Sequence, residues 1–317
     1  MVLKCNFKLK RRFFISILGL VILTITSSFF ISSAVAQYSG SKFSQQSGIG
    51  LSEDSKGLDV AYVPTPIFVV TEMLKLSSLG PNDFLIDLGS GDGRIIITAA
   101  QKFGALGFGV DLNPKLVELS KQYAIEEEVA DRTTFRIQNI FETDLRKADV
   151  VTMYLLPELN LKLRPKLISD LKPGARIVSH NYHLGEWRPD KTVLFKQATE
   201  DGDSIIYLWI VPANVVGTWQ WRMSLRSEEQ DFNLRLNQNF QDLSGSAMIQ
   251  GRKWPVFNTS LKGDRISFSL ISEGQIRLIR QDYTGRIKGN VITGTVKLSG
   301  ATEAKQMKWK ALRKEQQ

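Results

Sequence analysis

Apolar and polar positions follow two different patterns along the chain, and the change falls near residue 212. Before it, short apolar runs alternate with longer segments whose apolar residues recur every three or four positions, which indicates strands alternating with helices. Strands are expected at 84–88, 105–111, 134–137, 150–154, 175–179 and 204–209, and helices at 93–103, 114–127 and 159–171. This alternation predicts a doubly wound, mainly parallel α/β sheet with helices on both faces.

After residue 212 the apolar positions alternate with polar ones at a period of two, and glycine and asparagine separate the runs. Strands are expected at 218–225, 232–236, 245–249, 266–270, 276–279, 291–298 and 307–312. Such a pattern predicts a small all-β antiparallel barrel or sandwich of about eight strands. We interpret Trp219, Trp221 and Trp309 as core residues of this second domain.

The N-terminus carries a basic segment ending at Arg12, an apolar run from Phe13 to Ile31, and the small-residue pattern Ala34-Val35-Ala36. A signal peptide cleaved after Ala36 explains all three features. An uncleaved membrane anchor through residues 13–33 is the alternative, because the run is nearly long enough to cross a bilayer. A mitochondrial transit peptide fits worse. Either way the folded part is predicted to be exported (periplasmic or extracellular) or membrane-anchored, since the basic flank stays in the cytoplasm.

Residues 37–57 are rich in Ser, Gly and Gln, as expected of a flexible linker. The predicted organisation is therefore a signal peptide or anchor at 1–36, a linker at 37–57, an α/β domain at 58–212 and a β-domain at 213–317.

Composition excludes several kinds of site. The only cysteine, Cys5, lies in the apolar leader, so the folded part has no disulfide, no cysteine-ligated zinc and no cysteine nucleophile. The chain has only two histidines, His180 and His183, too few to suggest a metal set, and we expect them at the rim of a substrate site. The net charge of +9 falls to +4 without the leader's five basic residues, which is poor evidence for nucleic-acid binding.

A glycine-rich turn follows the first strand and carries the strongest chemical signal, Asp87-Leu-Gly-Ser-Gly-Asp-Gly-Arg94. Glycines permit positive φ there, and the next helix directs backbone N–H groups at a ligand. A second acid, Asp111, ends the following strand, where it can bind a ribose diol. The Gly-x-Gly-x-Gly spacing differs from the dinucleotide fingerprint, and Asp87 and Asp92 would repel a pyrophosphate but suit an amine or a sulfonium. An NAD-linked oxidoreductase is therefore disfavoured. The alternative is a turn that only packs helix on strand.

This turn resembles motif I of the class I S-adenosylmethionine (SAM) dependent methyltransferases, which implies a Rossmann-like methyltransferase sheet and SAM as cofactor. The resemblance extends over residues 60–190 to the family of the mitochondrial ATP synthase c-subunit lysine methyltransferase and its bacterial relatives. It is carried by the ordered segments Tyr62-Val-Pro-Thr-Pro66, Gly109-Val-Asp-Leu-Asn-Pro114, Tyr154-Leu-Leu-Pro157, Leu163-Arg-Pro-Lys-Leu167, Leu171-Lys-Pro-Gly174 and Val178-Ser-His180.

The resemblance also implies which residues bind SAM. The glycines line its methionine part, Asp87 lies near its amine, and Asp111 binds the ribose. Two residues from the N-terminal side close over the cofactor. Asn139 stands where related proteins usually have an Asp at the adenine. The implied cofactor-binding set is Tyr62, Thr65, Asp87, Gly89, Ser90, Gly91, Gly93, Asp111 and Asn139.

Tyr154 and Pro157, at the end of the fourth strand, occupy the place where substrate-facing residues sit in this fold. Tyr154 is either a substrate-orienting hydroxyl or a core tyrosine, and Glu158 is a weaker candidate acid. The resemblance implies methylation of a protein lysine, so a protein substrate is expected and no nucleic acid. The alternative is an exported, non-catalytic binding protein whose β-barrel carries the function. Export conflicts with the need for SAM, which is a cytoplasmic cofactor.

Overall fold

A computed structural model describes residues 62–199, 202–225, 228–273, 278–300 and 305–314. The leader and the linker predicted at 1–57 lie outside these residues, so those interpretations remain predictions. Within the described residues, no helix combines the length and the apolar character needed to span a bilayer.

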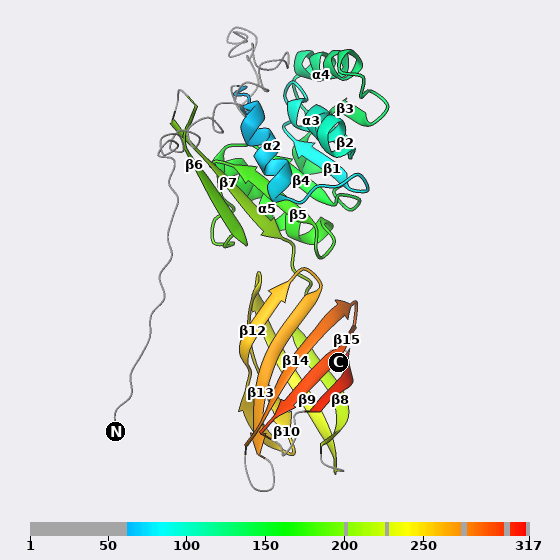
Figure 1. The fold of residues 1–317 in the computed structure, drawn as a ribbon, viewed down its shortest axis with the longest axis vertical. Helices are drawn as coiled ribbons and strands as arrows, with labels where there is room; N and C mark the ends of the chain where they lie inside the picture. Colours follow the sequence, from blue (N-terminus) through cyan, green and yellow to red (C-terminus); the bar gives the residue numbers. More distant parts are fainter. Residues whose placement is uncertain (1–61, 200–201, 226–227, 274–277, 301–304, 315–317) are drawn as a thin grey trace, which may run out of the picture. The chain divides into compact units, whose positions relative to one another are not determined.

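The first domain is built on a seven-stranded sheet in the order β3-β2-β1-β4-β5-β7-β6 (Figure 1). Strands β1 to β5 are parallel, and β7 runs antiparallel to both β5 and β6. The elements are α2 Ile67–Leu76, β1 Phe84–Leu88, α3 Arg94–Phe103, β2 Leu106–Asp111, α4 Pro114–Glu126, β3 Thr133–Ile137, β4 Val150–Met153, α5 Pro157–Asp170, β5 Arg176–His180, β6 Lys191–Thr199 and β7 Gly202–Ile210.

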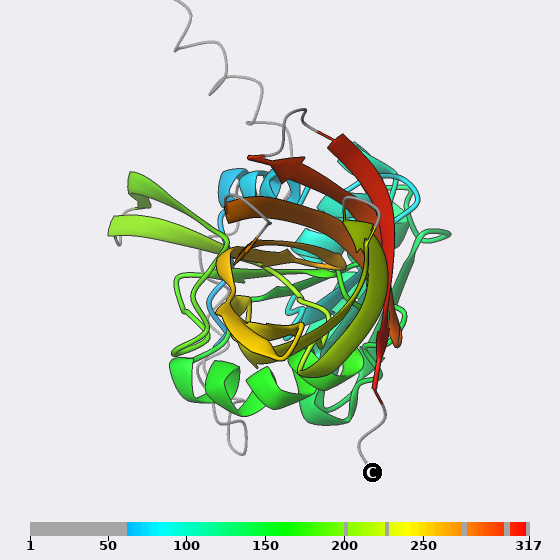
Figure 2. The ribbon, with the colours of Figure 1, turned by 90° about the horizontal axis from the view of Figure 1, so that it is seen from below.

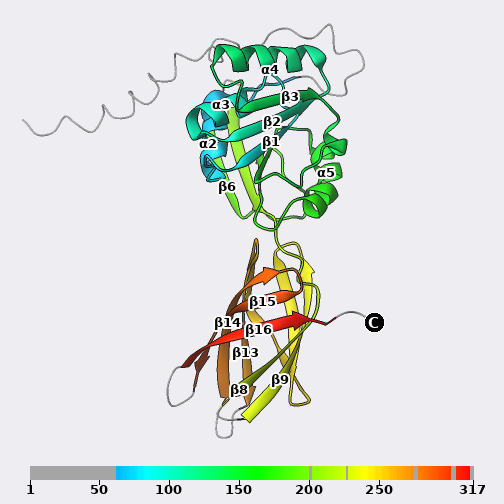
Figure 3. The ribbon, with the colours of Figure 1, turned by 90° about the vertical axis from the view of Figure 1, so that its right-hand side faces the viewer.

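Helices cover both faces of this sheet, with α2 and α3 on one side and α5 on the other (Figure 3). Helix α5 places Leu163 and Leu167 in one core with Ile86, Met153 and other strand residues. The central strands β1, β4 and β5 are buried on both faces, which is why they appear in the sequence as largely continuous apolar runs. The predicted doubly wound Rossmann-like sheet is confirmed.

The second domain is a single antiparallel sheet of nine strands in the order β11-β10-β9-β8-β16-β15-β14-β13-β12, which curves into a nearly closed barrel (Figure 2). Its strands are β8 Gly217–Leu225, β9 Glu228–Asn239, β10 Asp242–Ile249, β11 Arg252–Pro255, β12 Phe257–Lys262, β13 Arg265–Glu273, β14 Leu278–Lys288, β15 Val291–Ser299 and β16 Lys305–Arg313. The core contains Trp219, Trp221 and Trp309, as the alternation predicted.

Some elements carry no clear signal in the sequence. Helix α2 reads as a nearly continuous apolar run, Ile67-Phe-Val-Val-Thr-Glu-Met-Leu, and received no assignment. Strand β6 begins and ends with polar residues, and β11 has only four residues. In the barrel, β14 begins near the expected strand at 276–279 and continues to Lys288. The sheet therefore has one strand more than the approximate prediction.

Candidate active site

Parallel pairing brings the predicted site residues to one edge of the first sheet. Leu88, the last residue of β1, pairs with Val110 of β2 and with Met153 of β4, and Met153 in turn pairs with Ser179 of β5. The turns after these strands therefore begin side by side at their carboxyl ends. The chain order changes direction between β1 and β4, which is where open α/β sheets bind ligands.

The glycine turn adopts the conformation that the sequence predicted. Gly89, Gly91 and Gly93 have φ values of 78°, 52° and 80°, in the left-handed region. A Cβ atom on Gly91 would overlap the ring of Tyr62, and one on Gly89 would lie 2.8 Å from Leu155 Cδ2. The turn therefore needs glycine both for its backbone conformation and for the close approach of these side chains.

Asp87 is buried at the end of β1, with 1% of its surface exposed. Its Oδ1 accepts a hydrogen bond of 2.7 Å from Thr152 Oγ1 on β4, while its Oδ2 is buried with no hydrogen-bond partner among the described residues. Burial, assisted by the negative charges of Asp111 and Asp92, raises the pKa of Asp87 to about 7. A buried, unsatisfied carboxylate oxygen costs stability unless a ligand completes it.

Ser90 and Asp111 lie next to this carboxylate in the same turn region. The hydroxyl of Ser90 is also buried and has no partner within the described chain. Asp111 accepts backbone hydrogen bonds of 2.9 Å from Gly91 N at Oδ2 and of 2.9 Å from Asn113 N at Oδ1. Its carboxylate is thus fixed in orientation, and each oxygen keeps a lone pair for a further donor.

Asp92 has a different surrounding from the one expected. Its carboxylate forms a buried, bidentate ion pair with Arg94, with Nε–Oδ1 at 2.9 Å and Nη2–Oδ2 at 2.6 Å. Arg94 compensates its charge, so Asp92 does not serve as a second acid for a cationic ligand. Arg94 Nη1 also donates to the carbonyl of Thr65 at 2.9 Å, which ties the N-terminal segment to the turn.

Tyr62 and Thr65 both lie in that N-terminal segment. The ring of Tyr62 covers Gly91, and burial together with the charge of Asp92 raises the pKa of its hydroxyl above the usual range. Thr65 is buried, and its hydroxyl contacts His180 Nδ1 at 3.3 Å. The segment therefore lies over the glycine turn.

Asn139 follows β3 and begins a short 3₁₀ helix, Ile140–Glu142. Its Oδ1 accepts a hydrogen bond of 3.0 Å from Phe141 N, and its Nδ2 lies 3.5 Å from Glu142 Oε1. The oxygen that would accept from an adenine amino group already has a donor. The amide group is half-buried at the expected edge of the sheet, but part of its hydrogen-bonding capacity is used locally.

The predicted catalytic residues differ in their surroundings. Tyr154 directly follows β4 and packs its ring on His180, with 4.2 Å between ring centroids, and on Tyr182 at 6.1 Å. Pro157 is the first residue of α5 and is exposed, as is Glu158. A proline in the first helical turn has a sufficient structural explanation, because its missing N–H would have no intrahelical partner there.

Several residues at this edge form buried contacts that the sequence did not suggest. His180 is 2% exposed and bonded on both ring nitrogens, which differs from the expected rim position. Thr152 supports Asp87, and Arg94 holds Thr65. Asn160, fully buried on α5, donates to Ser179 Oγ at 3.3 Å and to the Tyr182 carbonyl at 3.2 Å. Only Arg94 and His180 stood in a quoted motif, so tertiary contacts alone reveal the other two.

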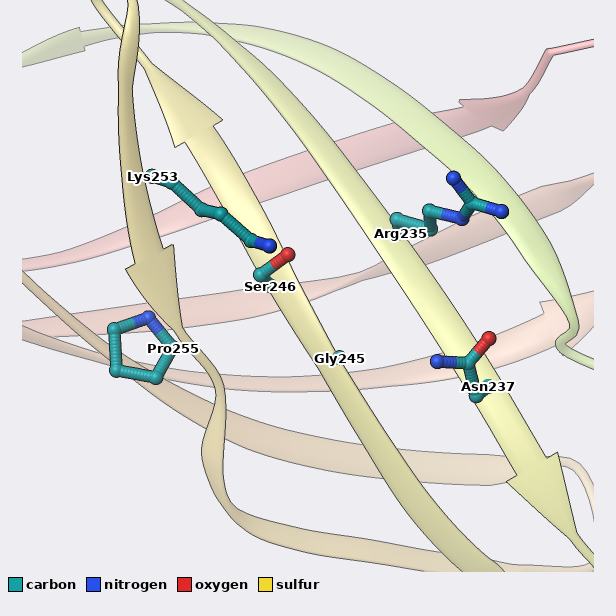
Figure 4. A pocket seen from close by; sticks show the side chains of 6 residues that line it. All are labelled: Arg235, Asn237, Gly245, Ser246, Lys253 and Pro255. Carbon is teal, nitrogen blue, oxygen red and sulfur yellow. The ribbon is translucent and has the colours of Figure 1, made fainter.

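A separate pocket of about 580 Å³ lies on β9, β10 and β11 of the second domain (Figure 4). Two cationic side chains and no carboxylate line it, so it lacks the acids that an amine or a ribose diol would need. Its lining residues are Arg235, Asn237, Gly245, Ser246, Lys253 and Pro255.

The residues around the glycine turn fit SAM. The buried Asp87 Oδ2 and Ser90 Oγ lack partners within the described chain, and a cationic amine satisfies such a carboxylate. Asp111 presents a fixed carboxylate 24 residues after Asp87, at the position that binds a ribose in this type of fold. Fold and site together define a class I SAM-dependent methyltransferase.

Comparison with known proteins agrees with this class. Residues 87–191 match the family model described as the ANTKMT methyltransferase domain. A protein-lysine N-methyltransferase from Saccharolobus islandicus is 39% identical over 155 residues, which cover 48% of this chain and 94% of that protein. The chain therefore belongs to the methyltransferase family that includes this archaeal relative and that the family model describes.

Two further comparisons differ in how much of the other protein they cover. The human lysine N-methyltransferase of the ATP synthase c-subunit is 32% identical, with 41% of this chain and 52% of that protein aligned. The chain thus spans about half the length of this relative. The solved structure of an RNA methyltransferase from Salinibacter ruber in complex with S-adenosylhomocysteine is 46% identical, with a TM-score of 0.45, covering 48% of this chain and 96% of that one.

Proposed function

We propose that this SAM-dependent methyltransferase transfers methyl groups to lysine side chains of a protein. The observation that carries the proposal is the 39% identity to a protein-lysine N-methyltransferase across 94% of that protein's length. Further relatives are named as lysine N-methyltransferases of the ATP synthase c-subunit and of adenine nucleotide translocase. These names support a lysine amine as the acceptor, but they do not identify the protein that this chain methylates.

Each predicted residue receives a role in this proposal. SAM supplies the methyl group on its sulfonium. Asp87 and Ser90 hold the amine end of the cofactor, and Asp111 holds the ribose. Gly89, Gly91 and Gly93 let the backbone approach the cofactor, while Tyr62 and Thr65 cover it. Asn139 borders the adenine.

The acceptor side is built from Tyr154 and the aromatic groups around it. A lysine amine must be neutral to act as a nucleophile, and a desolvated, largely apolar wall favours loss of its proton. Tyr154 orients this amine through its hydroxyl. Pro157 borders the same region by fixing the start of α5. Most of the rate enhancement then comes from positioning and exclusion of water.

A labelling experiment tests the acceptor class. The purified chain is incubated with methyl-tritiated SAM and a cell extract, and the products are divided into samples digested with protease or with ribonuclease. Label that disappears with protease and maps to methyl-lysine by mass spectrometry supports the proposal. Label that disappears with ribonuclease contradicts it. The Asp111→Ala variant serves as the control for label that does not depend on the cofactor site.

A further inference from the structure

His180 is the last residue of β5 and is buried, although it lies between two parts of the candidate active site. Its Nδ1 lies 3.3 Å from Thr65 Oγ1, and its Nε2 lies 3.2 Å from Ser204 Oγ on β7. All three side chains are at most 4% exposed. One ring nitrogen of a neutral imidazole donates and the other accepts, and a hydroxyl can do either. A neutral His180 therefore satisfies both contacts.

The neutral form is also the one that its surroundings favour. Burial alone lowers the pKa of His180 to about 4, with no charged group contributing. Its two hydrogen-bond partners, Thr65 in the N-terminal segment and Ser204 on β7, carry neutral hydroxyl groups, and its ring partner Tyr154 lies at the end of β4. The imidazole can thus hold two hydroxyl groups without placing a positive charge beside a cationic cofactor.

The face of the same ring packs against Tyr154. The two ring centroids are 4.2 Å apart with an interplanar angle of 43°, and Tyr154 in turn stacks on Tyr182 at 6.1 Å and 18°. Tyr182 is held by Asn160 and Ser179 through its backbone carbonyl, so this aromatic group rests on a hydrogen-bonded support. His180 thereby contacts the cofactor side through Thr65 and the acceptor side through Tyr154.

We propose that His180 is a positioning residue for methyl transfer, which fixes Thr65 and the ring of Tyr154 relative to each other. The simpler explanation is a buried histidine that only fills space. An apolar residue would fill that space without the cost of burying polar groups, whereas each polar contact here requires its partner to be in place. The acceptor side of this inference rests on the proposed function, while the cofactor side does not.

Two substitutions separate the hydrogen bonds of His180 from its ring packing on Tyr154. His180→Phe keeps a ring against Tyr154 but removes both hydrogen bonds. His180→Gln keeps a polar group but removes the ring. The comparison in the cofactor titration alone is His183→Gln, since His183 is exposed and its Nδ1 accepts from Gly185 N instead of a hydroxyl of the cofactor side. Thermal unfolding of each variant shows whether it is folded.

Calorimetric titration with S-adenosylhomocysteine, the demethylated product, tests the cofactor side. His180→Phe should weaken binding by about tenfold, which corresponds to about 1.4 kcal/mol, because Thr65 loses the hydrogen bond that positions it. The double variant Thr65→Val/His180→Phe should lose less than the sum of the two single losses, because His180 acts through Thr65. Additive losses, or an affinity of folded His180→Phe within about twofold of the parent, would overturn the inference.

Nuclear magnetic resonance gives a readout that needs no acceptor. With only two histidines, the chain has two imidazole signals, and His183→Gln identifies them. The His180 signal should remain that of a neutral ring down to about pH 5 and should shift when S-adenosylhomocysteine is added. A signal that is unmoved by the ligand would contradict a role at the cofactor site.

Turnover with the acceptor found by the labelling experiment tests the contact between His180 and Tyr154 on the acceptor side. His180→Gln should lower kcat by about tenfold with little change in the affinity for S-adenosylhomocysteine, because it mainly disturbs Tyr154. An unchanged kcat would overturn the acceptor-side role. If instead the labelled acceptor is RNA, the proposed function fails, whereas the calorimetric and magnetic resonance results still decide the role of His180 at the cofactor.

Discussion

Asp87 combines burial with an incomplete hydrogen-bond set, and this makes cofactor binding sensitive to pH. Its pKa of about 7 means that the carboxylate is largely protonated at pH 6 and largely ionised at pH 8. Only the ionised form attracts the amine of the ligand, so affinity for S-adenosylhomocysteine should fall about tenfold from pH 8 to pH 6. Calorimetry at both values measures this. The Asp87→Asn variant should bind weakly and with little pH dependence.

The raised pKa of Asp87 also predicts that the protein without ligand becomes less stable as pH rises, which is opposite to the trend in affinity. Because the pKa of Asp87 is raised in the folded state, the folded protein binds a proton that the unfolded chain releases between about pH 4 and pH 7. The contribution of this group to stability therefore decreases as pH rises through that window. Asp87→Asn should be more stable than the parent at pH 8, by about 2–4 kcal/mol in denaturant unfolding. Equal stability at pH 8 would argue against a buried, ionised Asp87.

Asp111 is predicted to hold the cofactor ribose. Asp111→Ala should weaken S-adenosylhomocysteine binding by more than about tenfold, since a charge-assisted hydrogen bond contributes ~1.5 to 3 kcal/mol. The structure adds a second effect, because the substitution also removes the acceptor for Gly91 N. Calorimetry measures the loss, and unchanged affinity would contradict the assignment.

Tyr154 is predicted to orient the acceptor through its hydroxyl. Tyr154→Phe preserves the ring packing on His180 and Tyr182, so affinity for S-adenosylhomocysteine should stay within about twofold of the parent while turnover falls. Steady-state kinetics and calorimetry on the same preparation separate the two effects. A parallel loss of both would indicate a core tyrosine, which the sequence left open.

The glycine turn is the element that connects strand, helix and N-terminal segment. Gly91→Ala should weaken S-adenosylhomocysteine binding strongly and lower stability by about 1–3 kcal/mol, because its Cβ would overlap Tyr62 in addition to the strain of φ 52°. Gly289→Ala is the matched control, since Gly289 has φ 59° in open space. It should lose stability through backbone strain alone and should bind normally. Similar binding by both variants would mean that Tyr62 does not cover the turn tightly.

Helices and strands were predicted correctly where the pattern of apolar and polar residues fits only one kind of element. The run Phe84–Leu88 and the helix ended by Gly104 were identified correctly because apolar continuity and a left-handed cap are local signals. Helix α2 was missed because a short apolar run is ambiguous between strand and helix. The pairing of β6 with β7 was missed because it depends on contacts between strands and little on the composition of either.

At the scale of the whole molecule, the α/β sheet and the barrel each enclose a hydrophobic core of described residues, from which we predict two thermal transitions. One core gathers residues of the α/β sheet, and the other gathers the barrel tryptophans. A ligand stabilises only the unit that binds it, so S-adenosylhomocysteine should raise the midpoint of one transition and leave the other in place. Scanning calorimetry with and without ligand measures this. A ligand-induced shift of both midpoints would show that the two units unfold together.

The predicted leader and its consequence for location remain predictions, because residues 1–57 lie outside those that the structure describes. The comparisons support a catalytic protein, and they give no support to the alternative of a non-catalytic exported binding protein. The predicted export conflicts with the need for SAM, and fractionation of cells into cytoplasm, membrane and exported protein tests whether the protein is exported.

The sequence by itself determined the doubly wound sheet followed by an antiparallel one, the positions of most strands, and the acids and glycines of the turn after β1, because all of these depend on local periodicity or on a contiguous motif. Tertiary structure alone decided what those residues do to one another. It paired Asp92 with Arg94, left one oxygen of Asp87 without a partner among the residues that it describes, and enclosed His180 between Thr65 and Ser204. Burial, pKa and hydrogen-bond completion depend on groups that are distant in the chain, so no spacing in the sequence could have specified them.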